Sequence, residues 1–165
     1  MMKKLWAPWR VKYLTITTKK QKGCVFCRMV RQGQDKKNLI FVRSQYSFAV
    51  LNLYPYNNGH ALVLPYRHVA DLDLLSAAQR EDLFALLAYT KKLLTKVLRP
   101  DGFNIGINIG KAAGAGFPGH VHIHIVPRWQ GDANFMPVVT DMRVISQSLT
   151  VLHKLLVKAK KDIPK

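Results

Sequence analysis

Three histidines alternate with aliphatic residues over positions 120–126, where the chain reads His-Val-His-Ile-His-Ile-Val. Successive side chains of a β-strand point to opposite faces, so this alternation predicts a strand with His120, His122 and His124 on one face. Alternate residues lie about 6.6 Å apart along a strand, which separates the outer two rings by roughly 13 Å. The three rings therefore cannot easily share one tetrahedral metal. The pattern favours a nucleophile over a catalytic metal that two of the histidines would hold.

The length and composition of the chain suit one folded domain. Its 165 residues, of which 48% are hydrophobic, are enough to bury a core, which argues against disorder. The longest apolar stretches are far shorter than the roughly 20 residues that span a bilayer, and the first residues contain no secretory apolar core. We expect a cytoplasmic protein without a membrane partner. Its single domain would cover residues 1–165, with a basic extension over 1–22 and a C-terminal helix with a basic tail over 141–165.

Alternation and turn signals predict several strands. Residues 38–51 are expected to form a hairpin, and residues 61–65 a short strand that a proline stops. Over residues 103–109 isoleucines alternate with asparagine and glycine, which predicts a strand with one buried face and one small, polar face. Something must approach that second face. We expect this strand to lie beside the histidine strand in an antiparallel sheet.

The helical signals complete an α+β fold. The sequence Ser-Ala-Ala-Gln at residues 76–79 has the form of a capping box, and leucines then recur at helical spacing as far as Arg99. This pattern predicts one long helix that packs on one face of the sheet. A leucine stripe predicts a second helix, which begins at about Asp141.

A glycine-rich segment over residues 108–119 lies directly before the histidines. Backbone amides of such a segment can gather around an anion, because few Cβ atoms stand in the way. A phosphate held there beside an imidazole would place a phosphorus electrophile opposite a nucleophile. His60 follows Gly59 in a turn, and we expect it to pack or to form a hydrogen bond rather than to catalyse.

The two cysteines, Cys24 and Cys27, are separated by two residues. In a reducing compartment this spacing is more typical of a metal knuckle or a redox pair than of a structural disulfide. Two thiolates and two histidines would complete a closed tetrahedral zinc site. A redox pair is less favoured, because no strand-to-helix unit opens at Cys24. The remaining alternative is an ordinary reduced pair with no metal.

The net charge of +17, from 26 basic and 9 acidic residues, has two interpretations. It can attract polyphosphate substrates, or it can form a nucleic-acid surface to which Trp6, Trp9 and Tyr13 would contribute stacking. Nucleic acid is the less favoured partner, because no zinc-finger or helix-turn-helix spacing follows the domain in the sequence. A noncatalytic nucleotide- or RNA-binding protein is thus the alternative from another functional class.

Taken together, Asn-x-Gly, a glycine-rich loop and three alternating histidines resemble the signature of the histidine triad superfamily of nucleotide hydrolases and transferases. Further segments are similar to a bacterial branch that includes diadenosine tetraphosphate phosphorylases. These segments are Leu-Trp-Ala-Pro-Trp-Arg at 5–10, the cysteine pair, residues 54–60, residues 65–68, Pro-Arg-Trp at 127–129 and residues 131–137. The resemblance implies a homodimer across which the sheet is extended.

The resemblance also assigns roles to individual residues. His122 would attack the α-phosphorus of a nucleotide and form a nucleotidyl-histidine, while His124 would steady the leaving group. Attack through one ring nitrogen requires the other to hold the proton, so we expect a carbonyl oxygen to fix the tautomer of His122. The phosphate oxygens would be held by Asn108, Gly114, Ala115 and Gly116, and the nucleoside by Asn52, Leu53 and Trp129.

For the metal, the resemblance implies one structural zinc per chain, held by Cys24, Cys27, His68 and His120, and no organic cofactor. The implied substrates are dinucleoside polyphosphates such as diadenosine tetraphosphate, which a phosphorylase or a hydrolase would cleave to products such as AMP or ATP. An adenine nucleoside phosphoramidase is the nearest alternative. The chain departs from the branch at Ala115 and Gly116, where the phosphorylases usually carry a hydroxyl side chain.

Overall fold

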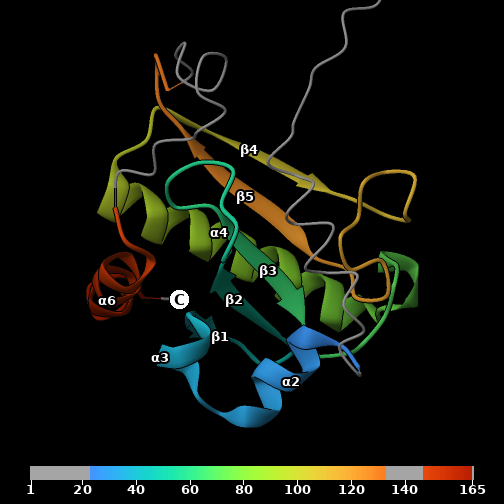
Figure 1. The fold of residues 1–165 in the computed structure, drawn as a ribbon. Helices are drawn as coiled ribbons and strands as arrows, with labels where there is room; N and C mark the ends of the chain where they lie inside the picture. The colour runs from blue at the N-terminus through green and yellow to red at the C-terminus, as the bar shows by residue number, and fades with distance from the viewer. Residues whose placement is uncertain (1–22, 133–146, 165) are drawn as a thin grey trace, which may run out of the picture.

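The computed structural model describes residues 23–132 and 147–164, and it contains a five-stranded antiparallel sheet with helices on both faces (Figure 1). The strands are β1 (Ile40–Arg43), β2 (Ser47–Leu51), β3 (Ala61–Pro65), β4 (Gly102–Ile107) and β5 (Ile123–Arg128). Their order in the sheet is β1-β2-β3-β5-β4. The predicted α+β class, the hairpin and the pairing of β4 with β5 are confirmed.

The long helix α4 (Ala77–Leu98) lies across one face of the sheet, with α6 (Leu149–Ala159) packed beside it (Figure 1). Its capping box is present, because the Ser76 side chain accepts a hydrogen bond from the Gln79 amide and the Gln79 side chain returns one. Helix α6 begins at Leu149 after the cap residue Ser148. The earlier start expected near Asp141 lies outside the described residues.

Three shorter helical segments complete the described fold. They are α2 (Val25–Gln32), α3 (Asp35–Asn38) and the 3₁₀ helix η1 (Leu72–Leu74). Helix α2 buries Phe26 against the face of the sheet opposite to α4. Within the described part of the chain, no helix has the length and apolar character needed to cross a membrane.

Alternation along the strands sorts the core into two layers. In β3, Ala61 and Val63 join the large cluster under α4 and α6, whereas Leu62 and Leu64 join the smaller cluster that contains Phe26. Ile123 and Ile125 of β5 belong to the large cluster. The intervening histidines therefore face the side that carries α2, as the alternation predicts.

The histidine strand is shorter than the sequence predicts. It begins at Ile123 rather than at His120, because the amide of Val121 donates to the carbonyl oxygen of Val69, in a segment outside the sheet, at 2.7 Å. His120 and His122 therefore lie just before β5, and only His124 lies within it.

The neighbouring strand β4 also ends early, at Ile107 rather than at Ile109. The expected buried face is only partly formed, since Ile105 is 48% and Ile109 is 42% exposed. The physical reason is that β4 is the last strand of the sheet, while α4 lies mainly across β2 and β3.

Candidate active site and metal centre

His122 is held in one tautomer by the backbone. Its Nδ1 lies 2.9 Å from the carbonyl oxygen of His120, and the ring is buried. A carbonyl oxygen only accepts hydrogen bonds, so Nδ1 carries the hydrogen and Nε2 carries the lone pair. This is the arrangement expected for a nucleophile. Burial lowers the pKa of His122, against a smaller opposing effect of the hydrogen bond to the His120 carbonyl, so the ring favours its neutral form.

His124 is oriented by His60, whose Nε2 lies 2.9 Å from Nδ1 of His124. The amide of Tyr56 donates to Nδ1 of His60 at 3.0 Å, which makes that nitrogen an acceptor. His60 must then donate from Nε2, and His124 carries its own hydrogen on Nε2. Burial, followed by the neighbouring His124 and His122, lowers the pKa of His60 to about 3. The sequence predicted a hydrogen-bonding role for His60 but did not identify this partner.

Asn52 begins the loop that carries His60. Its backbone amide donates to the His60 carbonyl oxygen at 2.9 Å, and its side-chain oxygen accepts from the backbone amide of Tyr54 at 3.0 Å. Asn52 thus closes the loop 52–60 beside the histidines. The next side chain, Leu53, is 60% exposed.

Strand β4 places Gly106 beside the histidines, because Gly106 pairs with His124 and Ile107 pairs with Ile123. Asn108 directly follows the end of β4, and its expected phosphate contact stays a prediction. Among the described residues, no atom beyond the adjoining ones lies within 4 Å of where a Cβ on Gly106 would be. The small, polar face predicted for this strand therefore lies open next to His124.

Two backbone amides of the glycine-rich loop donate hydrogen bonds within the loop itself. Gly114 donates to the Lys111 carbonyl oxygen at 3.0 Å, and Ala115 donates to that of Gly110 at 3.4 Å. Gly110 and Gly114 both have positive φ, which a side chain would disfavour. Of the three loop residues expected, with Asn108, to hold phosphate oxygens, Gly116 is the one whose backbone amide does not take part in these two bonds.

Trp129 follows the end of β5, five residues beyond His124, which corresponds to about 16 Å along a strand. Its amide donates to the Asp132 carboxylate at 3.1 Å. The expected contact of Trp129 with the nucleotide stays a prediction.

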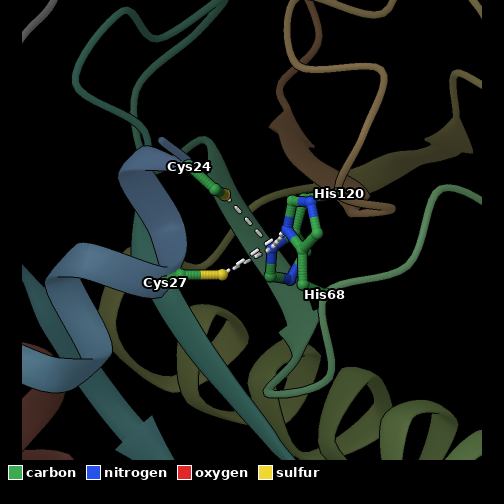
Figure 2. A group of neighbouring side chains, drawn as sticks. All are labelled: Cys24, Cys27, His68 and His120. Carbon is green, nitrogen blue, oxygen red and sulfur yellow. Dashed lines mark hydrogen bonds between the residues drawn. The ribbon is translucent and has the colours of Figure 1, made fainter. Parts of the chain in front are cut away.

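The two cysteines and two histidines converge on one point (Figure 2). Their four ligand atoms all lie within 4.8 Å of one another. Nδ1 of His120 lies 3.3 Å from Sγ of Cys24, 3.6 Å from Sγ of Cys27 and 3.3 Å from Nδ1 of His68. Sγ of Cys27 lies 3.5 Å from Nδ1 of His68. These are the four residues that the resemblance named.

These separations fit a tetrahedral metal. Bonds of about 2.0–2.3 Å in a tetrahedron place neighbouring ligand atoms roughly 3.3–3.8 Å apart. The other ring nitrogen of His120, Nε2, lies 2.9 Å from the carbonyl oxygen of Pro65, so Nε2 donates and the lone pair of Nδ1 faces the cluster. Among the described residues, the side chains grouped closely enough to bind a metal ion are those of Cys24, Cys27, His68 and His120. His122 does not belong to this group.

Phe26 contacts both His120 of the cysteine–histidine cluster and His122, and sequence reasoning missed it. Its ring lies 5.5 Å from the ring of His120 and 5.5 Å from that of His122. Phe26 is 4% exposed and stands between Cys24 and Cys27 in sequence. The aromatic residue inside the Cys-x-x-Cys pair was the available signal.

Comparison with known proteins gives consistent results. A family model described as the HIT domain matches residues 33–131. The AP-4-A phosphorylase of Mycobacterium tuberculosis (strain ATCC 25618 / H37Rv) is 37% identical over 161 residues, covering 94% of this chain and 83% of that protein. The asymmetrical bis(5'-nucleosyl)-tetraphosphatase of Schizosaccharomyces pombe is 40% identical over 93 residues, or 56% of this chain and 50% of that protein.

Among solved structures, a Zn-bound histidine triad family protein from Mycobacterium smegmatis superposes with a TM-score of 0.68. It is 27% identical, and the match covers 85% of this chain and 94% of that one.

Proposed function

Because the chain belongs to the HIT domain family, we propose that it is an enzyme that cleaves dinucleoside polyphosphates at the α-phosphorus, with His122 as the nucleophile. The observation that carries the proposal is the bond from Nδ1 of His122 to the His120 carbonyl, which leaves the lone pair on Nε2. The relatives named AP-4-A phosphorylase and bis(5'-nucleosyl)-tetraphosphatase support this substrate class.

The reaction runs as two displacements. Nε2 of His122 attacks the α-phosphorus in line, and the bond from phosphorus to the bridging oxygen of the leaving polyphosphate breaks. His124 donates a hydrogen bond from Nε2 to that oxygen as its charge develops. Water or inorganic phosphate then displaces the nucleotidyl group and restores His122. With phosphate as acceptor the second product is a nucleoside diphosphate, and with water it is a nucleoside monophosphate.

The surrounding residues bind and orient the nucleotide. We assign the nonbridging oxygens to the side chain of Asn108 and the amide of Gly116, both of which come from the segment before the histidines. We assign binding of the ribose hydroxyls to Asn52. The base packs on Leu53, whose side chain is exposed to solvent. Gly114 and Ala115 shape the loop through their own hydrogen bonds.

We also propose that Cys24, Cys27, His68 and His120 hold one structural zinc. The ligand separations and the orienting bond to Pro65 support this assignment. Zinc would supply a closed tetrahedral cross-link without a labile position, so it would take no part at the phosphorus. The chain's own contribution is to fix the segment before β5 against α2.

The partner most compatible with the sheet is a second copy of this chain. Strand β4 ends the sheet, and it presents Ile105 with 48% of its surface exposed. An edge strand with an apolar side chain is a place where natural sheets add a strand, and antiparallel pairing of β4 with its own copy satisfies a two-fold axis. We propose a homodimer through this edge.

The test is turnover of diadenosine tetraphosphate with and without inorganic phosphate. Wild-type protein should release a nucleoside diphosphate only when phosphate is present, and protein denatured during turnover should carry an acid-labile nucleotide. His122→Ala should abolish both while still binding nucleotide. His153→Gln is the matched control, because His153 is a buried histidine that bonds the Ile40 carbonyl at 2.9 Å, away from the site. Absence of turnover by the wild type would contradict the proposal.

A further inference from the structure

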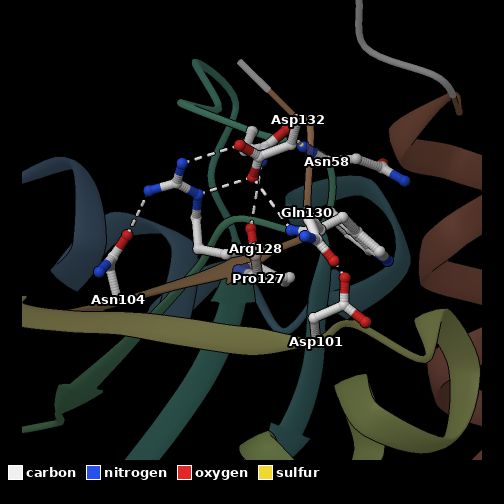
Figure 3. Close-up of polar contacts among 9 residues, drawn as sticks. Asn58, Asp101, Asn104, Pro127, Arg128, Gln130 and Asp132 are labelled. Atoms are coloured by element: carbon white, nitrogen blue, oxygen red, sulfur yellow. Dashed lines mark hydrogen bonds and ion pairs between the residues drawn. The ribbon is translucent and has the colours of Figure 1, made fainter.

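A carboxylate outside the histidine site accepts hydrogen bonds from two segments, the end of β5 and the loop 52–60 (Figure 3). Oδ2 of Asp132 accepts from Nε of Arg128 at 2.6 Å, from the amide of Trp129 at 3.1 Å and from Nδ2 of Asn57 at 2.8 Å. Oδ1 accepts from the other arm of Arg128 at 2.8 Å. The Asp132 side chain is 10% exposed, against 45% for Arg128, so the carboxylate lies largely inside the turn.

The guanidinium of Arg128 fixes the orientation of this carboxylate. A guanidinium that donates two parallel hydrogen bonds sets both the position and the plane of its partner. The remaining arm of Arg128 donates to Oδ1 of Asn104 on β4 at 2.6 Å, which ties the pair to the neighbouring strand (Figure 3). These bonds lower the pKa of Asp132 to about 2, with the Arg128 hydrogen bond as the main cause, so the acceptor stays ionised.

Asn57 carries the constraint from Asp132 into the loop 52–60. Its Nδ2 donates to Asp132 and also to the carbonyl oxygen of Pro127, the latter at 3.2 Å. Its Oδ1 accepts from the amide of Asn58 at 2.9 Å. Both hydrogens and the oxygen of this amide are therefore engaged, which joins the loop to the end of β5.

The same residue leads on to the histidines. The amide of His60 donates to the carbonyl oxygen of Asn57 at 3.1 Å, and the ring of His60 bonds to Nδ1 of His124 at 2.9 Å. Only Asn58 and Gly59 separate the two residues, and Gly59 has a φ of +78°, a conformation that favours glycine. The position of Asn57 therefore bears directly on that of His60.

We propose that Asp132 is a positioning residue, which through Asn57 holds His60 in place to donate to His124. This inference rests on the proposed function, in which His124 presents its Nε2 hydrogen to the leaving oxygen. Loss of the Asp132 carboxylate leaves the Asn57 side chain with only its bonds to the Pro127 carbonyl and the Asn58 amide, which lets the loop shift. His60 then no longer fixes the tautomer of His124, and the chemical step slows while nucleotide binding is kept.

The test compares Asp132→Ala with Asp101→Ala. Asp101 accepts a hydrogen bond from the amide of Gln130 in the same turn at 2.7 Å, so its loss disturbs the turn but does not remove a bond to Asn57. Asp132→Ala should lower kcat for diadenosine tetraphosphate about tenfold with KM within twofold, as expected for a slightly misplaced catalytic group. Asp101→Ala should keep kcat within twofold. A change in KM alone, or equal losses in both variants, would overturn the proposal.

A double-mutant cycle with Asn57→Ala tests the route. If Asp132 acts through Asn57, the double variant should be no slower than Asn57→Ala alone, whereas independent effects would multiply. Multiplied losses would refute the route. Should Asp132→Ala fail to fold, Asp132→Asn removes the charge, keeps the side-chain shape and must lower kcat in the same way.

Nitrogen NMR of histidine-labelled protein gives a readout without substrate. In the wild type and in Asp101→Ala, His124 should show its hydrogen on Nε2, and in Asp132→Ala its two ring nitrogens should shift toward a mixture of tautomers. An unchanged His124 would overturn the proposal. If the wild type cleaves no dinucleotide, the proposed function fails, whereas the tautomer measurement still decides the role of Asp132.

Discussion

His120 is bonded to His122 through its backbone and to the cysteine cluster through its ring. Its carbonyl oxygen lies 2.9 Å from Nδ1 of His122, while its own Nδ1 lies 3.3 Å from Sγ of Cys24. The opposite ring nitrogen of His120 bonds the Pro65 carbonyl at 2.9 Å. The residue that sets the tautomer of His122 therefore contacts the cysteine–histidine cluster on one side and strand β3 on the other.

Removal of zinc should therefore affect both stability and catalysis. We expect about one zinc per chain, and chelation should lower Tm by at least about 5 °C, because a structural metal contributes to folding. Turnover of diadenosine tetraphosphate should also fall when zinc is removed. Cys27→Ser treated with the same chelator is the control and should show little further change. Elemental analysis and thermal denaturation measure these effects, and less than half an equivalent of zinc after purification without chelators would count against the site.

Burial of His60 should make the fold sensitive to acid. Its pKa is lowered to about 3 in the folded chain, against an ordinary value of 6.5. Between these two values the unfolded chain holds more protons than the folded one, so the free energy of unfolding decreases as pH falls. The slope from this one group is at most about 1.4 kcal/mol per pH unit.

His60→Gln should thus show a shallower loss of stability than the wild type when urea denaturation is compared at about pH 7 and about pH 5. Leu62→Ala, a cavity variant that keeps His60, should be less stable throughout but retain the wild-type slope. Equal slopes for His60→Gln and the wild type would show that His60 is not held neutral.

The open face at Gly106 should be the place where substrate lies. Gly106→Val adds a branched side chain beside His124, where no described atom blocks it, so the sheet should tolerate it while KM for diadenosine tetraphosphate rises tenfold or more. Gly102→Val is the matched control, because Gly102 lies in the same strand opposite Arg128 and also has open space. Steady-state kinetics that change equally in both variants would argue against a substrate site on this face.

The edge strand β4 should control the oligomeric state. Ile105→Asp places a charge in the middle of the proposed interface and should convert a dimer into a monomer in light scattering. Leu74→Asp changes an equally exposed apolar residue, 53% exposed in η1, and should remain dimeric. A wild type that is monomeric at high concentration, or an unchanged dimer in Ile105→Asp, would contradict the assignment.

Local signals predicted most of the fold. The capping box at Ser76 predicted the start of α4, and a short apolar run between a turn and a proline predicted β3 with the bounds that the structure shows. Helix α2 was missed because its cap residue, Cys24, makes no side-chain capping bond and only Phe26 of the helix is buried. Cys24 instead contacts His120, which is a tertiary feature.

The site was predictable to the extent that it rests on spacing along one strand. The shared face of the three histidines and the tautomer of His122 followed from alternation and chemistry. The contact between His60 and His124 joins positions 64 residues apart, and no local pattern encodes it. The start of β5 was misplaced for the same reason, since the bond from Val121 to Val69 belongs to the tertiary fold.

The hydrogen on Nδ1 of His122 also governs how the covalent adduct discharges. In the proposed reaction that hydrogen stays on Nδ1, donated to the His120 carbonyl oxygen, so the ring becomes a cation once phosphorus is attached to Nε2. A cationic imidazole is a good leaving group. A weak nucleophile such as water or phosphate can therefore displace it without prior protonation of the ring. The backbone of His120 thereby keeps the adduct energy-rich.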